Sequence, residues 1–86
     1  RYLVANYEAA AEIYVTLVAA DPASAQFRRE LASQYDNLGT ATGDVSWWQK
    51  AVAAVEPLAA GEAPNGRDVA LLQKLRAKAS GRSAQP

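Results

Sequence analysis

The sequence predicts an all-α fold of about four helices, arranged as antiparallel hairpins. In four stretches apolar residues recur at spacings of three and four, the period of a helix with one buried face. Between these stretches lie residues typical of helix ends, namely Pro22, Gly39, Gly43 and the run 61–64. The 86 residues make one small domain or a piece of a larger one, and we expect marginal stability because so short a chain buries little surface.

The first helix is predicted over residues 7–20. Asn6 is suited to cap its N-terminus, and residues 1–5 are expected to be a short lead-in or the last turn of a preceding helix. Pro22 ends the helix, because the residue before a proline is displaced from the α region. The apolar stripe comprises Ala10, Ile13, Tyr14, Leu17 and Val18.

The second helix is predicted over residues 24–38, with Ser24 as its N-cap. Gly39 is suited to the left-handed position that follows a helix end, so a loop is expected over residues 39–43. One face of this helix is apolar and the other is continuously polar. The apolar residues are Phe27, Leu31, Tyr35 and Leu38.

The third helix is predicted over residues 45–60 with Asp44 as its cap, and Pro57 should kink or end it. It has two apolar stripes, so we expect it to be covered on two sides. The fourth helix is predicted to follow Asn65 and to reach Ala79. The segment 65–68 resembles a capping box with Asp68 in the distal role, and residues 81–86 are expected to form a disordered tail.

Composition excludes several kinds of chemistry. The chain contains no Cys and no His, so thiol chemistry, disulfides and imidazole bases or ligands are absent. We therefore expect no enzyme activity, no catalytic residue, no cofactor and no metal. Glu8 and Glu12 lie one helical turn apart, but without a His or Cys partner they are interpreted as solvated surface.

Charge and hydropathy give expectations about partners and location. The net charge is zero, which favours neither nucleic acid nor an anionic membrane as a partner. Residues 65–86 nevertheless carry five basic side chains against one acidic, whereas residues 1–64 carry four basic and eight acidic ones. The longest apolar run, residues 13–20, is far shorter than the roughly 18 residues of a membrane span, and Thr16 interrupts it. We expect a cytoplasmic protein that does not bind membranes.

The first and third helices coincide when the chain is shifted by 34 positions, which places Tyr14 on Trp48. At this spacing the sequence resembles the tetratricopeptide repeat. A first, incomplete unit matches the small residue, the aromatic residue and the terminal proline of the repeat pattern. The second unit matches the pattern in part and departs from it at three positions. The matches are Ala10, Tyr14 and Pro22, then Leu31-Ala32, Tyr35, Trp48 and Ala51; the departures are Phe27 and Pro57, each shifted by one residue, and Asp44 in place of Ala.

The resemblance implies an α-solenoid fragment and a protein-interaction function. Residues 1–60 would form one and a half repeats, and residues 61–80 the C-terminal helix that caps such an array. Because Arg1 is not a natural start, we expect a fragment of a larger bacterial protein whose preceding repeats pack before residue 1. Residues 17–32 also resemble repeats appended to bacterial serine/threonine protein kinases. A recruitment segment of such a kinase and an unrelated four-helix bundle remain alternatives.

The resemblance also implies a groove for a protein or peptide partner. Family positions assign this groove to the polar side of the second helix, with Arg29 suited to a carboxylate and Asn37 to a peptide backbone. The Lys and Asn set with which some family members hold a C-terminal carboxylate is absent. The residues implied are Gln26, Arg29, Ser33, Asp36 and Asn37.

Trp47 has two possible roles, because adjacent helical residues point about 100° apart and one flat contact cannot bury both Trp47 and Trp48. Trp48 matches the core aromatic of the repeat. Trp47 is expected either to lie under the fourth helix or to be exposed as an anchor for a partner.

Overall fold

The computed structural model describes residues 2–81, and within that range the secondary structure is entirely helical. The four main helices are α1 (Tyr2–Ala20), α2 (Ala25–Thr42), α3 (Val45–Val55) and α4 (Gly66–Ala79), and a short 3-10 helix η1 (Glu56–Ala59) follows α3. No strand occurs among residues 2–81, so the prediction of an all-α fold with four helices is confirmed. The predicted disordered tail lies, from residue 82 onward, outside the described residues.

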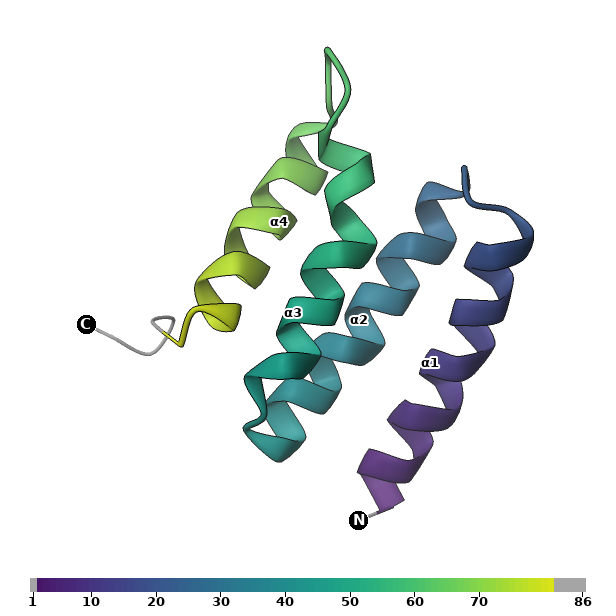
Figure 1. Cartoon of the computed structure of the whole chain (residues 1–86), viewed down its shortest axis with the longest axis vertical. Helices are drawn as coiled ribbons and strands as arrows, with labels where there is room; N and C mark the ends of the chain where they lie inside the picture. Colours follow the sequence, from purple (N-terminus) through teal and green to yellow (C-terminus); the bar gives the residue numbers. More distant parts are fainter. Residues whose placement is uncertain (1, 82–86) are drawn as a thin grey trace.

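Consecutive helices run antiparallel and lie side by side (Figure 1). α1 packs on α2, α2 on α3 and α3 on α4. α1 and α4 lie at opposite edges of this array and are not among its packed pairs (Figure 1). The array is therefore a slab, with extents of 38 × 35 × 15 Å. A closed four-helix bundle would bring its first and last helices together, so this arrangement counts against the bundle alternative.

The predicted start of the first helix and the predicted end of the second are wrong. α1 begins at Tyr2, so Asn6 lies inside the helix and caps nothing. The Ala-rich composition explains this, because a run of good helix formers outweighs the cap preference of one Asn. α2 continues through Gly39 to Thr42, and Gly43 takes the left-handed position with φ 74°. The predicted loop is thus reduced to the two residues that separate α2 from α3.

The N-caps of α2, α3 and α4 agree with the sequence. Ser24, Asp44 and Asn65 each accept a hydrogen bond from a backbone N–H in the first turn of the helix that follows. The third helix was predicted to reach residue 60, but α3 ends at Val55 and the chain continues as η1, whose first turn contains Pro57. The prediction that this proline kinks or ends the helix is therefore confirmed, and the predicted end at residue 60 is wrong. The capping box at the start of α4 is incomplete, because the Asp68 carboxylate bonds to Arg29 and not to the backbone.

The core lies along the lines where neighbouring helices meet. Small residues, including Ala32 and Ala51, are almost fully buried there and let the helices approach closely. Tyr14 on α1 and Trp48 on α3 are both half-buried and pack against this same core cluster. The buried members of the cluster are Ala11, Leu31, Ala32, Ala51, Ala54, Val55, Leu72 and Leu75.

α1 is the most exposed of the long helices, with Ala11 as its single buried residue. An 18-residue window of α1 has a mean hydropathy of 1.2, so by length and composition α1 is the one helix in residues 2–81 that could cross a membrane. From the sequence we expected no membrane-spanning helix, because only residues 13–20 were counted as an apolar run and Thr16 interrupts it. The helix was also predicted to begin at Tyr7, whereas α1 begins at Tyr2. Four large apolar side chains on α1 are exposed, namely Tyr2, Leu3, Ile13 and Val15.

Candidate functional site

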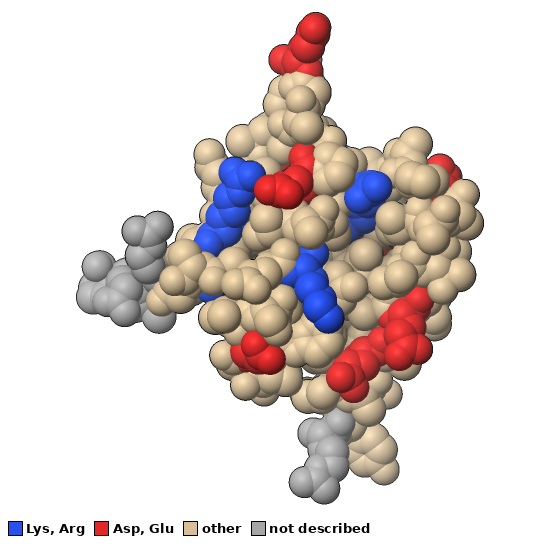
Figure 2. Space-filling view, viewed as in Figure 1, with Lys and Arg blue, Asp and Glu red and all other residues tan. Residues whose placement is uncertain are grey.

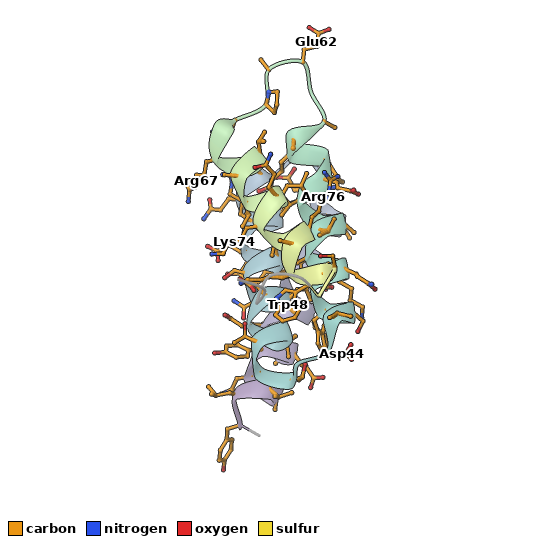
Figure 3. The ribbon with its side chains drawn as sticks, turned by 90° about the vertical axis from the view of Figure 1, so that its left-hand side faces the viewer. Asp44, Trp48, Glu62, Arg67, Lys74 and Arg76 are labelled. Carbon is orange, nitrogen blue, oxygen red and sulfur yellow. The ribbon has the colours of Figure 1, made fainter. Side chains whose placement is uncertain are left out.

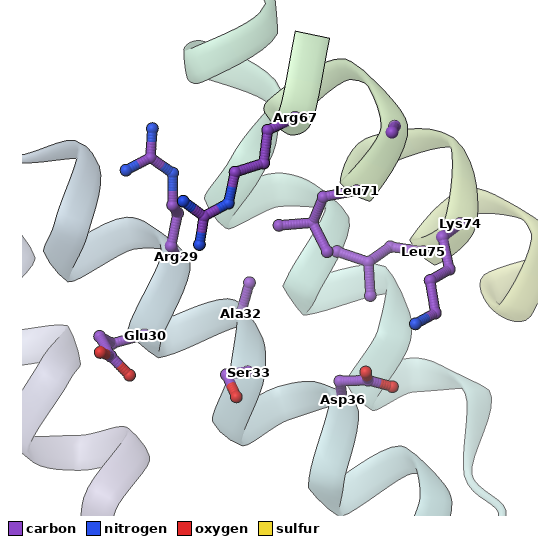
Figure 4. Close-up of a pocket in the computed structure, with 10 residues that line it drawn as sticks. Arg29, Glu30, Ala32, Ser33, Asp36, Arg67, Leu71, Lys74 and Leu75 are labelled. Carbon is purple, nitrogen blue, oxygen red and sulfur yellow. The ribbon is translucent and has the colours of Figure 1, made fainter. Parts of the chain in front are cut away.

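A groove of about 480 Å³ runs between α2 and α4 (Figure 4). Three of the five residues predicted to bind a peptide line it, namely Arg29, Ser33 and Asp36. Gln26 and Asn37 do not line it; Gln26 is exposed and Asn37 is half-buried. The complete lining is Arg29, Glu30, Ala32, Ser33, Asp36, Arg67, Ala70, Leu71, Lys74 and Leu75.

Helical periodicity explains why these residues share a groove. Along each helix the lining residues recur at intervals of three and four, which places them on one face. The two helices are the second and fourth of an antiparallel series, so they run in the same direction and present two parallel rows. Sequence reasoning found the α2 row alone. The α4 row was missed because its basic residues resemble any solvated helix face.

Arg29 and Asp68 form a bidentate ion pair at one end of the groove. Arg29 Nε donates to Asp68 Oδ1 at 2.7 Å, and Arg29 Nη2 donates to Asp68 Oδ2 at 2.9 Å. Asp68 is only 2% exposed, so α4 contributes a buried carboxylate that α2 must neutralise. Arg29 was predicted to hold a ligand carboxylate. In the structure the carboxylate that Arg29 holds is that of Asp68, so Arg29 links α2 to α4.

This pairing determines the charge state of both groups. The hydrogen bonds from Arg29 lower the pKa of Asp68 below its ordinary value of 3.8, against the opposing effect of burial. The same bonds raise the pKa of Arg29. Both side chains therefore remain charged at neutral pH.

We expect the stability of the protein at acid pH to depend on this pair. A carboxylate whose folded-state pKa is lowered contributes stability above its unfolded-state pKa, about 4, and this stability is lost as the pH falls through the folded-state value. The urea midpoint should therefore fall between about pH 6 and pH 3, and it should fall less in Asp68→Asn. The pKa of Asp44 is also lowered, by hydrogen bonding from Ser46. Its contribution to the loss of stability at acid pH is the same in the unmodified protein and in Asp68→Asn. An equal fall in both would contradict this role for Asp68.

Asp36 lies at the other end of the groove and is also engaged. Its Oδ1 accepts a hydrogen bond from Trp48 Nε1 at 2.8 Å and from Lys78 Nζ at 2.9 Å. These bonds connect α2 to α3 and to the last turn of α4, so Asp36 is a structural link. Both bonds use the same carboxylate oxygen, Oδ1.

Arg67 and Lys74 are the cations of the groove that remain available. Both are exposed, and neither side chain makes a hydrogen bond or ion pair with another residue in the range 2–81, although the charge of Arg67 helps to lower the pKa of Asp68. Both point to the same side of α4, whereas Arg76 points to the other side (Figure 3). Between them and α2 lie the buried side chains of Ala32 and Leu75. The groove thus combines two positive charges without an ion-pair partner with two carboxylates, Glu30 and the already bonded Asp36, beside the partly exposed Leu71.

Trp47 does not lie under α4, and its predicted role as an anchor for a partner stays a prediction. It is half-buried, and its ring stacks on Tyr35 of α2 with 5.9 Å between the ring centroids. It lines a hollow together with residues of α1, on the side of α3 away from α4. Trp48 is the tryptophan near α4, with Lys78 Nζ 6.0 Å from its ring centroid.

The α2–α4 groove offers exposed charged side chains that a ligand could contact. Among residues 2–81 there is no group of three or more His, Cys, Asp or Glu side chains that could hold a metal ion. At the two ends of the groove, Arg29 is paired with Asp68 and Asp36 with Lys78. Comparison of the chain with protein-family models, curated proteins and solved structures found no match.

Proposed function

We propose that this chain is a non-catalytic protein-interaction domain whose α2–α4 groove binds an acidic peptide segment of a partner protein. The observation that carries the proposal is the pair Arg67 and Lys74, two cations without an ion-pair partner beside an apolar side chain, Leu71. A peptide with acidic and apolar residues in alternation could pair with the cations and cover the partly exposed Leu71. The same groove would serve equally if the chain is a recruitment segment attached to an enzyme.

The shape of the domain supports this proposal. In tetratricopeptide-like solenoids, the first helices of successive hairpins line one face, and partners bind there. Here α2 and α4 would be those helices, and the groove between them lies where such a partner would bind. Tyr14 and Trp48, which the repeat pattern makes equivalent, both pack on the shared core cluster.

We propose further that another hairpin of the same kind packs on the outer side of α1. Tyr2, Leu3 and Ile13 are exposed there by 60% or more, and a solenoid buries such a face with its neighbouring unit. The opposite edge differs, because the exposed residues of α4 outside the groove include the small or polar Gln73 and Ala77, as in a terminal capping helix.

The acidic-peptide proposal is tested by fluorescence anisotropy with a labelled peptide of alternating Glu and Leu. We expect binding that weakens as salt is added, and we expect no binding of the peptide in which Lys replaces Glu. Lys74→Ala and Arg67→Ala should each weaken binding about two- to five-fold, the usual range for an exposed ion pair.

The matched control is Arg76→Ala, which also removes one exposed charge from α4 but on the other side of the helix. Its affinity should equal that of the unmodified protein. If Arg76→Ala weakens binding as much as Lys74→Ala does, the peptide responds to the overall charge of α4, and the groove is not its site.

A further inference from the structure

A second groove lies on the opposite face of the slab, between α1 and α3. Its volume is about 560 Å³, and it is lined by Glu8, Ala11, Glu12, Val15, Thr16, Tyr35, Trp47 and Lys50. Figure 2 shows this face, with an acidic patch over α1 and a basic side chain over the middle of the slab. Figure 4 shows the helices from the other side, with α1 on the left, so the two grooves face in opposite directions.

One wall of the second groove is aromatic. The rings of Tyr35 and Trp47 are stacked with an angle of 27° between their planes. Burial raises the pKa of Tyr35, so its hydroxyl remains neutral under ordinary conditions. Lys50 Nζ lies 4.6 Å from the centroid of the Trp47 ring. The chain therefore already holds one cation against this wall, which shows that the wall is placed to attract positive charge.

The other wall is acidic. Glu8 and Glu12 are both exposed, and neither side chain makes a hydrogen bond or ion pair with any residue in the range 2–81. Lys50 lines the same groove but lies against Trp47 and not within ion-pair distance of either carboxylate. The two carboxylates are the only charges on α1, so no neighbouring cation on that helix offsets them.

We propose that this second groove binds an arginine-bearing basic segment of a partner protein. A guanidinium group stacks on aromatic rings and pairs with carboxylates in a planar geometry, so it fits both walls at once. A shallower hollow of about 380 Å³ shares Tyr35 and Lys50 with the groove and extends it along α3. The elongated shape favours a polypeptide segment over a small cation. No residue lines both this groove and the α2–α4 groove, so each proposal can be tested independently of the other.

The direct test is an NMR titration with the acetylated, amidated peptide Ala-Arg-Ala-Arg-Ala. The chain has two tryptophans, and the Trp48 indole N–H donates to Asp36, on the α4 side of the slab. We expect the Trp47 indole signal to shift on titration while the Trp48 signal stays in place. The lysine version of the peptide should bind more weakly, and the glutamate version should not bind.

Three exposed positions make the test specific. Glu8→Gln and Glu12→Gln should each weaken arginine-peptide binding about two- to five-fold. Lys50→Gln should strengthen it by a similar factor, because the variant vacates the face of Trp47 that the peptide must occupy. Glu62→Gln, in the loop between η1 and α4, is the matched control and should change nothing. Circular dichroism confirms that each variant is folded.

The proposal is overturned if the Trp47 signal does not move, if the glutamate peptide binds equally well, or if Lys50→Gln weakens binding. It is also overturned if sedimentation shows that the chain self-associates through Glu8 and Glu12 and binds no peptide, because the occupant would then be a second copy. Loss of acidic-peptide binding in Lys74→Ala leaves this second groove unaffected, so failure of one proposal is distinguished from failure of the other.

Discussion

Replacing Asp68 with Asn should lower the free energy of unfolding by about 2 kcal/mol, the range for hydrogen bonds to a charged group. Asp68 is nearly fully buried and receives two hydrogen bonds from Arg29. The amide that replaces it carries no charge, and its NH₂ group faces a donor of Arg29. The effect stays below that of a fully buried ion pair because the side chain of Arg29 is 29% exposed and can turn toward water.

The measurement is urea denaturation at neutral pH followed by circular dichroism. The control is Glu62→Gln, which makes the same kind of change at the exposed tip of a loop and should leave the midpoint unchanged (Figure 3). A chain of this size has few kilocalories to lose, so the Asp68→Asn midpoint should shift clearly. Equal midpoints for the two variants would mean that the Arg29–Asp68 pair contributes nothing to the packing of α4 on α2.

Gly39→Ala should also destabilise the protein, although alanine is the better helix former. A Cβ at this position would lie 2.5 Å from the Trp48 ring, and Trp48 cannot easily withdraw because its Nε1 is bonded to Asp36. Overpacking of this kind costs about 1–3 kcal/mol. It is offset by about 1 kcal/mol of helix propensity. We expect a net loss of up to about 2 kcal/mol in urea denaturation.

Gly66→Ala is the matched control for this prediction. Gly66 is the first residue of α4, its φ is not positive, and a Cβ there would meet no atom within 4 Å. This variant should be as stable as the unmodified protein or slightly more so. If Gly39→Ala behaves in the same way, Trp48 does not pack closely on α2, and the account of the α2–α3 crossing is wrong.

Gly39 also illustrates what the sequence could not reveal. Local rules make a glycine near the end of an apolar stripe a helix terminus. Its actual role is to admit Trp48, a contact between two helices that no local pattern contains. Asn6 failed as a cap for a related reason, since a cap preference holds only where the chain does not continue as helix. Periodicity and prolines were sufficient for the number and order of the helices.

The site shows the same division between local and tertiary information. The α2 row of the groove followed from the resemblance and from helical spacing, and Arg29, Ser33 and Asp36 do line the groove. Which of them are available could not be predicted, because the partners of Arg29 and Asp36 lie about forty residues away on α4. The cations that remain available, Arg67 and Lys74, were hidden among basic residues typical of any surface helix.

The central claim is that the α2–α4 groove is the binding face for an acidic segment, and amide chemical-shift mapping tests it most directly. On titration with the Glu–Leu peptide, the largest shifts should fall on Ser33, Leu71 and Lys74, and residues of α1 should not respond. Shifts centred on α1 and α3, or no shifts at peptide concentrations that saturate binding by anisotropy, would contradict the claim.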